Sequence, residues 1–220
     1  RLQLIRRPRA SGHLVAFLAE PLAGRIRRAA SQPDGSGWSS PCWKTGQGME
    51  LYGQPLLLVC THGSRDRCCG RQGGELFHRL GSEAPGLAWQ SSHLGGHRFA
   101  PTALSLPDGL QYGRITDAAG LAEAVSEQRL FRSDRLRGKT SWPKPAQAAA
   151  ASLFPGDPTI PRLLGCREEG GGWIVRLSGS EGGERVCMVR REPLGARALA
   201  SCADSEPREL HGWTVSPLDS

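Results

Sequence analysis

Long apolar runs and Cys-x-x-Cys pairs are both missing from this chain of 220 residues. No apolar stretch approaches the roughly 18 residues that a membrane-spanning helix needs, so we expect no membrane span. Thiol chemistry of the thioredoxin type would have to use the adjacent Cys68 and Cys69, and a vicinal pair is poorly placed to form a disulfide. The sequence therefore argues against a transmembrane helix and against a thiol oxidoreductase.

Apolar side chains are also scarce, at 38% of the chain, whereas glycine (29) and proline (16) are abundant. This composition predicts many turns and short elements rather than long helices. The net charge is +7, and arginine carries most of the positive charge. A basic surface can attract nucleic acid, an acidic protein or an anionic surface, and the charge alone does not choose among them. Because these arginines are scattered and lack interleaved aromatic residues, they favour an ordinary solvated basic face over a nucleic-acid surface.

The cysteines number seven, an odd count, and no apolar secretory segment accompanies them. Such a count favours thiols that are free or metal-bound in a reducing compartment, so we expect a cytoplasmic protein. Cys42, Cys166, Cys187 and Cys202 have no paired spacing and are predicted to be structural. Cysteine chemistry is therefore expected between residues 60 and 69.

Residues 51–131 carry the clearest pattern of secondary structure. The predicted elements are a strand, a helix, a strand, two hairpin strands and a helix, over 55–60, 70–80, 87–91, 103–106, 110–114 and 117–125. The first strand is a continuous apolar run, the hairpin strands flank a Pro-Asp-Gly turn, and Thr116 or Asp117 caps the last helix. This order predicts an α/β (α+β) domain with a thioredoxin-like core.

Two flanking regions complete the predicted organisation. Residues 1–50 are expected to form a hairpin, with Leu2–Arg7 paired to His13–Glu20, followed by a long loop over 31–48. Residues 132–220 are expected to hold a basic connector, a short helix and an antiparallel β region, over 132–144, 145–154, 173–177, 185–190, 196–202 and 213–216. We therefore predict an N-terminal hairpin, a central domain and a β-rich C-terminal region.

Two pairs of potential metal ligands follow the first two strands of the central domain. Cys60 and Cys69 lie in CTHGSRDRCCG, and His93 and His97 lie in SSHLGGHRFAP. Thiolate sulfur and imidazole nitrogen together bind zinc or an iron-sulfur cluster. Because both loops leave adjacent strands of one small sheet, we expect the four side chains to form a metal or cluster site.

Neighbouring residues leave some of the ligand assignment open. Cys68 could replace Cys69, but Cys69 comes directly before the predicted helix, whose N-terminus favours a thiolate, and we prefer it. His62 is expected to donate a hydrogen bond to a ligand rather than to bind the metal itself. Gly95 and Gly96 place His93 and His97 in a loop rather than on one face of a helix.

Charged residues close to the ligands are expected to influence the site. Arg65, Arg67 and Arg98 are predicted to surround the metal and to favour its more negative, reduced state. Asp66 is expected to orient one of these arginines. The alternative interpretation, that they are ordinary solvated arginines, stays open.

The motifs CTHGSRDRCCG, WQSSHLGGHRFAPTALSLPDGLQYGRI and RGKTSWPKPAQA resemble those of the sucrase/ferredoxin-like family, over about residues 56–150. The resemblance implies a thioredoxin-like ferredoxin domain with one 2Fe-2S cluster, and it implies ligation by Cys60, Cys69, His93 and His97. The word sucrase finds no support, because no pair of carboxylates is placed for glycoside chemistry.

A cluster held by two thiolates and two neutral imidazoles has no net charge when oxidised. Adding an electron to it costs less than adding one to the dianion of a four-Cys ferredoxin, so we expect a higher potential, as in Rieske centres. Reduction could also couple to imidazole protonation and make the potential pH-dependent. These implications favour an electron carrier over an enzyme. Its partner is expected to be a redox protein with an acidic docking surface. The alternative is a zinc-binding structural or interaction module.

Overall fold

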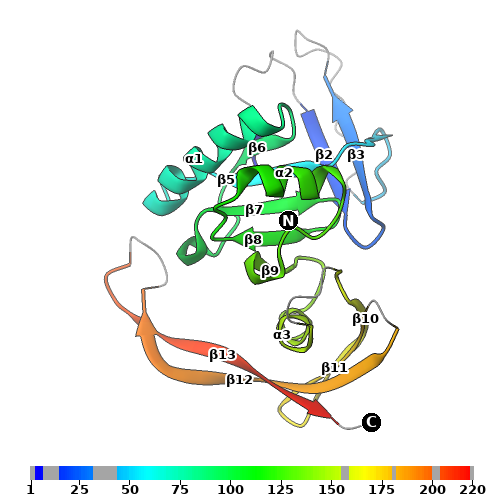
Figure 1. Ribbon diagram of the computed structural model, residues 1–220, viewed down its shortest axis with the longest axis vertical. Coiled ribbons are helices and arrows are strands. Elements are labelled where there is room, and N and C mark those ends of the chain that lie inside the picture. Colours follow the sequence, from blue (N-terminus) through cyan, green and yellow to red (C-terminus); the bar gives the residue numbers. More distant parts are fainter. Residues whose placement is uncertain are drawn as a thin grey trace.

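The computed structural model describes residues 3–6, 15–31, 44–154, 159–179, 182–199 and 204–218. Within these residues the strands form three sheets (Figure 1). The largest sheet has six strands in the order β1 (Ile5–Arg6), β6 (Ala88–Ser91), β5 (Leu56–Cys60), β7 (Thr102–Leu106), β8 (Leu110–Gly113) and β9 (Leu136–Lys139). The described helices are too short or too polar to span a membrane.

The six-stranded sheet contains the strands predicted within residues 51–131, together with β1 and β9 from outside that range. β5 pairs in parallel with β6 and antiparallel with β7. Helix α1 (Arg67–Glu83) connects the two parallel strands, as a parallel pair requires, and α2 (Ala118–Ser126) follows the hairpin of β7 and β8. The predicted order of strand, helix, strand, hairpin and helix is confirmed, and so is the mixed α+β class.

The core of this domain lies where α1 and α2 pack together against the sheet. All five residues of β5 are buried, which explains its continuous apolar sequence. Leu76 and Leu80 of α1 and Leu121 of α2 belong to the same buried cluster. Asp117 caps α2 as predicted, because its side chain accepts a hydrogen bond from the Gly120 amide at 2.9 Å.

Tyr112 of β8 links the sheet to the chain after α2. It is fully buried, and its hydroxyl accepts a hydrogen bond from the Phe131 amide at 3.3 Å. Burial raises the pKa of Tyr112 to about 12, from an ordinary value of 10.0. In the unfolded chain this tyrosine therefore loses its proton at a lower pH than in the folded protein.

The stability of the fold should consequently fall as the pH rises from about 10 through about 12, by about 2 kcal/mol from this group. We expect Tyr112→Phe to have a shallower decline over that range, measured by urea unfolding at each pH. Equal slopes for the two proteins would show that Tyr112 does not ionise on unfolding.

The N-terminal strands pair differently from the prediction. β1 pairs with β6 rather than with the next strand, and β2 (Val15–Glu20) pairs with β3 (Arg25–Ala30). A hairpin is therefore present, but the predicted partnership of 2–7 with 13–20 is wrong. The predicted turn at 8–12 lies outside the described residues. β1 is stabilised by a partner far along the chain, since Arg6 Nε donates to Gln90 Oε1 at 2.7 Å.

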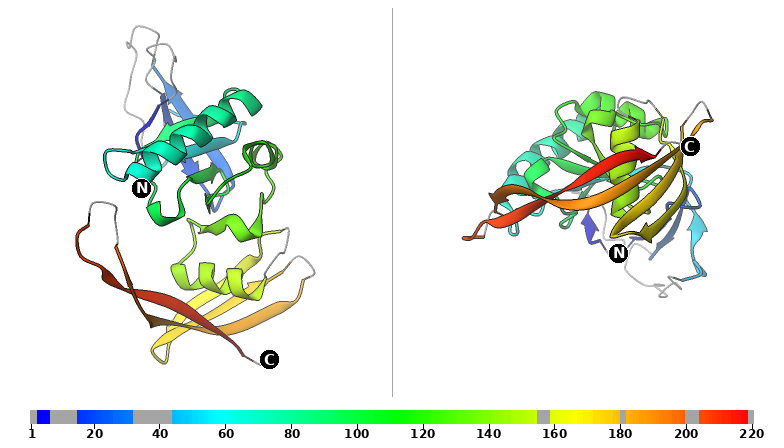
Figure 2. Two further views of the ribbon diagram at one scale, coloured as in Figure 1. Left: turned by 60° about the vertical axis from the view of Figure 1, so that its left-hand side comes forward. Right: turned by 90° about the horizontal axis from the view of Figure 1, so that it is seen from below.

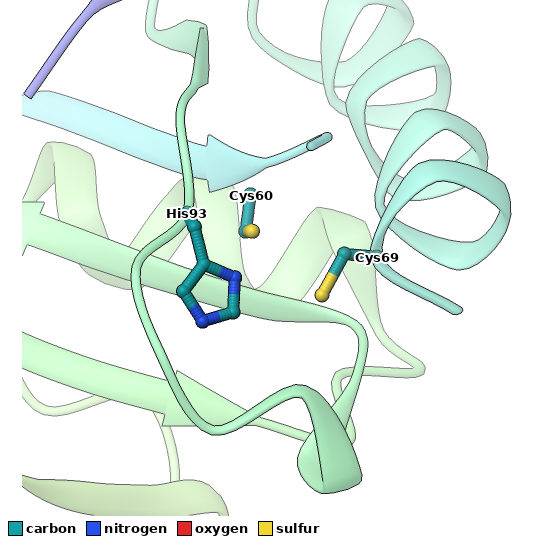
Figure 3. A group of neighbouring side chains, drawn as sticks. All are labelled: Cys60, Cys69 and His93. Carbon is teal, nitrogen blue, oxygen red and sulfur yellow. The ribbon is translucent and has the colours of Figure 1, made fainter. Parts of the chain in front are cut away.

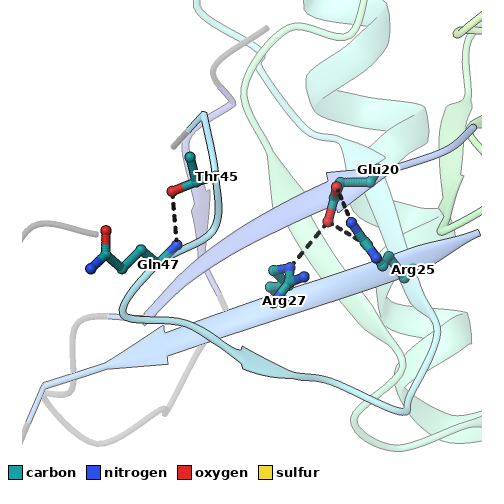
Figure 4. Close-up of polar contacts among 5 residues, drawn as sticks. All are labelled: Glu20, Arg25, Arg27, Thr45 and Gln47. Atoms are coloured by element: carbon teal, nitrogen blue, oxygen red, sulfur yellow. Dashed lines mark hydrogen bonds and ion pairs between the residues drawn. The ribbon is translucent and has the colours of Figure 1, made fainter. Parts of the chain in front are cut away.

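The three-stranded sheet of β2, β3 and β4 (Glu50–Leu51) packs beside the central domain through aromatic contacts. Phe17 of β2 meets Trp89 of β6 edge to face, with ring centroids 5.5 Å apart. At the turn between β2 and β3, the Glu20 carboxylate accepts hydrogen bonds from Arg25 and Arg27 (Figure 4). The bond from Arg25 is the main cause that lowers the pKa of Glu20 to about 2.

The C-terminal region is a curved four-stranded sheet that wraps around helix α3 (Lys144–Leu153), as Figures 1 and 2 show. Its strands, in spatial and chain order, are β10 (Arg162–Glu169), β11 (Gly172–Ser178), β12 (Glu184–Ala198) and β13 (Arg208–Leu218). Ala146 and Ala149 of α3 are fully buried against Val175 and Leu177 of β11. Small residues on this helix face let it lie close to the sheet.

Three local predictions for the C-terminal region are corrected. The strand expected at 185–190 and residues 196–198 of the strand expected at 196–202 belong to a single strand, β12, whose distal half pairs with β13 alone. Residues 200–202 lie outside the described residues. β10 was not predicted, because charged residues interrupt its alternation. The basic connector of 132–144 contains β9, which pairs with β8 and extends the central sheet.

Candidate metal centre

Three of the four predicted ligands meet at one end of the parallel strands. The donor atoms of Cys60, Cys69 and His93 all lie within 4.8 Å of one another. Figure 3 shows the imidazole of His93 facing the two sulfur atoms. Cys60 and Cys69 are at most 1% exposed, whereas the His93 side chain is 22% exposed. Among these three donors, the histidine is thus the one that reaches solvent.

The local fold explains why these residues converge. Cys60 is the last residue of β5, and the pairing of β5 with β6 continues into the loop, where the Thr61 amide donates to the Ser91 carbonyl at 3.2 Å. His93 lies two residues beyond β6. Cys69 is the third residue of α1, so it lies inside the first turn rather than before the helix as predicted. The helix begins earlier, at Arg67, but its N-terminal turn still faces the site.

Glycines allow the ligand loops to pack tightly. A Cβ atom added to Gly70 would lie 2.6 Å from the Cα atom of Gly63, so the first turn of α1 touches the loop that follows Cys60. Gly63 thus provides a close backbone contact with the helix. Gly95 and Gly96 have φ values of 95° and 72°, which favour glycine, and they turn the chain between the two histidines as predicted.

The two buried thiols differ sharply in acidity. A hydrogen bond from the Cys69 thiol, with further bonds from the backbone amides of Leu94 and His62, lowers the pKa of Cys60 to about 5. The hydrogen bond with Cys60, the burial of the thiol and the repulsion from Cys60 raise the pKa of Cys69. The proton of the Cys69 thiol thus points to the Cys60 sulfur. A cation bound there would replace that proton and stabilise both thiolates.

His97, the fourth predicted ligand, is held by a carboxylate. Its Nδ1 atom lies 3.0 Å from Oδ1 of Asp66, and Nδ1 of His93 lies 3.6 Å from Oδ2 of the same residue. Asp66 is 2% exposed and occupies the N-cap position of α1, where its side chain makes no cap hydrogen bond. The structure thus brings Cys60, Cys69 and His93 together, and it places His97 beside them on Asp66.

The position of Asp66 was not foreseen. We expected this residue to orient an arginine, whereas its side chain lies against the two histidines. Its place immediately before α1 gave no signal of this contact, because an aspartate there is expected to cap the helix, and Asp66 makes no cap hydrogen bond. A carboxylate beside a metal-binding imidazole fixes the ring and its tautomer.

The chemistry of the donor set fits a thiophilic metal or cluster. When Nδ1–H of His97 donates to Asp66, the lone pair of this imidazole lies on Nε2. Nε2 of His97 is buried, and within the described residues it has no hydrogen-bond partner. Such an unpaired nitrogen is costly in a protein interior, and a metal ion would satisfy it. Two thiols, two imidazoles and the amide donors to Cys60 suit such a site.

The other residues predicted around the site take different positions. The backbone amide of His62 supports Cys60, and Cys68 donates its thiol proton to the His97 carbonyl at 3.5 Å. Arg65, Arg67 and Arg98 are exposed, and no ion pair of theirs occurs in the part of the chain that is described. Of the cysteines predicted to be structural, Cys166 and Cys187 pack in the C-terminal sheet, and Cys42 and Cys202 lie outside the described residues.

The segment that builds this centre also matches a known family. The sequence model described as sucrase/ferredoxin-like matches residues 12–138, which include both ligand loops and the strands that carry them. The chain belongs to the sucrase/ferredoxin-like family. The resemblance noted in the sequence is therefore confirmed at the level of the family.

A curated relative of this sucrase/ferredoxin-like chain is a fungal protein. Altered inheritance of mitochondria protein 32 from Meyerozyma guilliermondii is 28% identical over 95 residues, which cover 38% of this chain and 34% of the relative. The matched part thus spans about a third of that protein's length. No solved structure matches the chain.

Proposed function

We propose that this sucrase/ferredoxin-like protein is an electron carrier with one 2Fe-2S cluster, held by Cys60, Cys69, His93 and His97. The observation that carries the proposal is the buried thiol pair facing the His93 imidazole within 4.8 Å, at the end of the parallel strands β5 and β6. His97 supplies the fourth ligand through Nε2, its buried and unpartnered nitrogen within the described chain.

The surroundings of the thiols favour redox chemistry over substrate chemistry. Both sulfurs are enclosed, so a substrate has no path to them, whereas an electron can cross a few ångströms of protein. Backbone amides that donate to Cys60 reduce the negative charge on its sulfur, and such bonds raise the potential of a bound cluster. The bound cluster would supply a single reversible one-electron step.

The residues of this chain have separate roles in that proposal. Asp66 orients the imidazole of His97 through its hydrogen bond at Nδ1. The His93 side chain is 22% exposed, so this ligand would lie where the centre meets solvent.

The composition of the purified protein tests this function. Anaerobic purification should give a coloured protein with about two iron and two sulfide per chain, and dithionite should produce the EPR signal of a reduced 2Fe-2S cluster. Potentiometric titration should give a midpoint above the roughly −400 mV of plant-type ferredoxins. The same three donors would also suit zinc, so a colourless protein with zinc and no sulfide would overturn the proposal in favour of a zinc module.

A further inference from the structure

Two arginine side chains stack on Phe99, two residues after His97, and a third arginine directly precedes it in the chain. The Cζ atoms of Arg114 and Arg137 lie 5.1 and 3.2 Å from the centroid of the Phe99 ring. Arg98 precedes Phe99 in the short helix η1 (His97–Phe99). All three arginines are exposed. We refer to Arg98, Arg114 and Arg137 as the Phe99 arginine cluster.

The backbone is shaped to hold this cluster together. The Arg114 amide donates to the Phe99 carbonyl at 2.7 Å, which fixes the end of β8 to η1. Arg114 has a φ of 54°, in the left-handed region that disfavours residues other than glycine. A Cβ atom on Gly113 would lie 2.8 Å from Cβ of Phe99 and 3.2 Å from Cδ of Arg137, so this glycine is needed for the stacking. A strained arginine kept at the surface points to a role in binding.

The charge of the cluster is not neutralised within the molecule. Throughout the described ranges, none of its three arginines forms an ion pair, whereas Arg25, Arg132 and Arg176 each bond a carboxylate. Burial, then the charges of Arg114 and Arg98, lower the pKa of Arg137. Like charges held close together without a counterion create a positive potential that attracts anionic groups.

The cluster lies on the histidine side of the candidate metal centre. Arg98 follows His97 directly, and His93, the exposed donor of the trio, belongs to the same loop. Because the two cysteines are enclosed, a partner would approach the centre from the loop that carries the two histidines. A protein bound at the cluster would therefore sit next to the histidines.

We propose that the Phe99 arginine cluster is the docking surface for a carboxylate-rich face of the protein that exchanges electrons with this centre. The inference rests on the proposed function. One electron crosses the interface in each encounter, from the reduced partner to the oxidised one, and no covalent bond forms or breaks. Docking beside the histidines shortens the path for that electron, and opposite charges raise the rate of encounter.

A protein surface suits the cluster better than a small anion. Sites for small ligands are concave, and they enclose most of the ligand. The cavity of about 330 Å³ beside Arg137 is lined mainly by apolar residues and includes neither Arg98 nor Arg114. The exposed guanidinium groups of Arg114 and Arg137 on the ring, with exposed Arg98 next to it in the chain, instead present an open surface, which matches several carboxylates spread over a partner.

An acidic peptide tests the surface without reference to the metal. We would titrate an octaglutamate peptide that carries a neutral fluorophore, and measure its anisotropy at low salt with the protein as purified. The variant Arg98→Gln/Arg114→Gln/Arg137→Gln should bind about tenfold more weakly than the wild type. The control Arg190→Gln/Arg191→Gln/Arg208→Gln removes the same charge from exposed positions on β12 and β13, and should bind within about twofold of the wild type. Equal weakening in both variants would overturn the proposal.

A second measurement tests docking during electron transfer. The reduced holoprotein is mixed in a stopped-flow instrument with ferricyanide, a trianion, or with tris(phenanthroline)cobalt(III), a trication. The variant of the Phe99 arginine cluster should react about tenfold more slowly than the wild type with the anion but not with the cation. The control variant should change little with either oxidant. A uniform change with both oxidants would contradict a docking role. Peptide binding that depends on the cluster, in a protein without iron, would instead overturn the electron-transfer function and leave the acidic docking surface standing.

Discussion

Cys69→Ser should purify without its metal centre, whereas Cys68→Ser should retain it. A serine hydroxyl keeps its proton at neutral pH, so it cannot replace a thiolate ligand. Cys69 is enclosed and lies within 4.8 Å of Cys60 and His93, whereas the half-buried Cys68 directs its thiol to the His97 carbonyl. We expect the iron and sulfide of Cys69→Ser to fall below about a tenth of the wild-type content.

The two serine variants form a matched pair, because the substitutions are adjacent and chemically identical. Both proteins should be purified anaerobically side by side, analysed for iron, zinc and sulfide, and compared by visible absorption. Thermal unfolding in the presence of a chelator checks that each variant folds without its metal. Loss of the metal from Cys68→Ser with retention in Cys69→Ser would reverse the ligand assignment. Retention in both would place the metal elsewhere.

The sequence was most informative where the structure depends on local patterns. A continuous apolar run predicted β5, and the pattern over 70–80 predicted a helix that forms most of α1. Because β5 and β6 are adjacent and parallel, residues after each strand had to meet at one edge of the sheet. Cys60 and His93 could therefore be placed together before any coordinates were known.

The features that sequence reasoning missed depend on contacts between distant segments. β1 has only two residues and pairs with β6, and nothing in its own sequence indicates that partner. β9 lies in a basic stretch, and it pairs with β8 and packs against α3. The contact of Asp66 with both histidines likewise needs the loops after β5 and β6 to meet. Long-range pairing leaves no periodic signal along the chain.

Gly73→Ala should be strongly destabilising, while Gly74→Ala should be stabilising. Both glycines lie inside α1, where alanine is intrinsically favoured by about 1 kcal/mol. A Cβ atom on Gly73 would lie 1.9 Å from the carbonyl oxygen of Cys60 and 3.0 Å from its carbonyl carbon. Both are backbone atoms of the central strand, so the helix or β5 must move. A Cβ atom on Gly74 meets nothing within 4 Å.

We expect a net loss of about 3 kcal/mol in the free energy of unfolding for Gly73→Ala, and a gain of about 0.5–1 kcal/mol for Gly74→Ala. Urea unfolding of the two variants and the wild type measures both differences. Since the atom displaced in Gly73→Ala belongs to Cys60, the same variant should also bind less metal at a temperature where it remains folded. Similar stability of the two variants would show that α1 does not press on the end of β5. Reduced stability with full metal content would show that the helix shifts while the strand and its ligand stay in place.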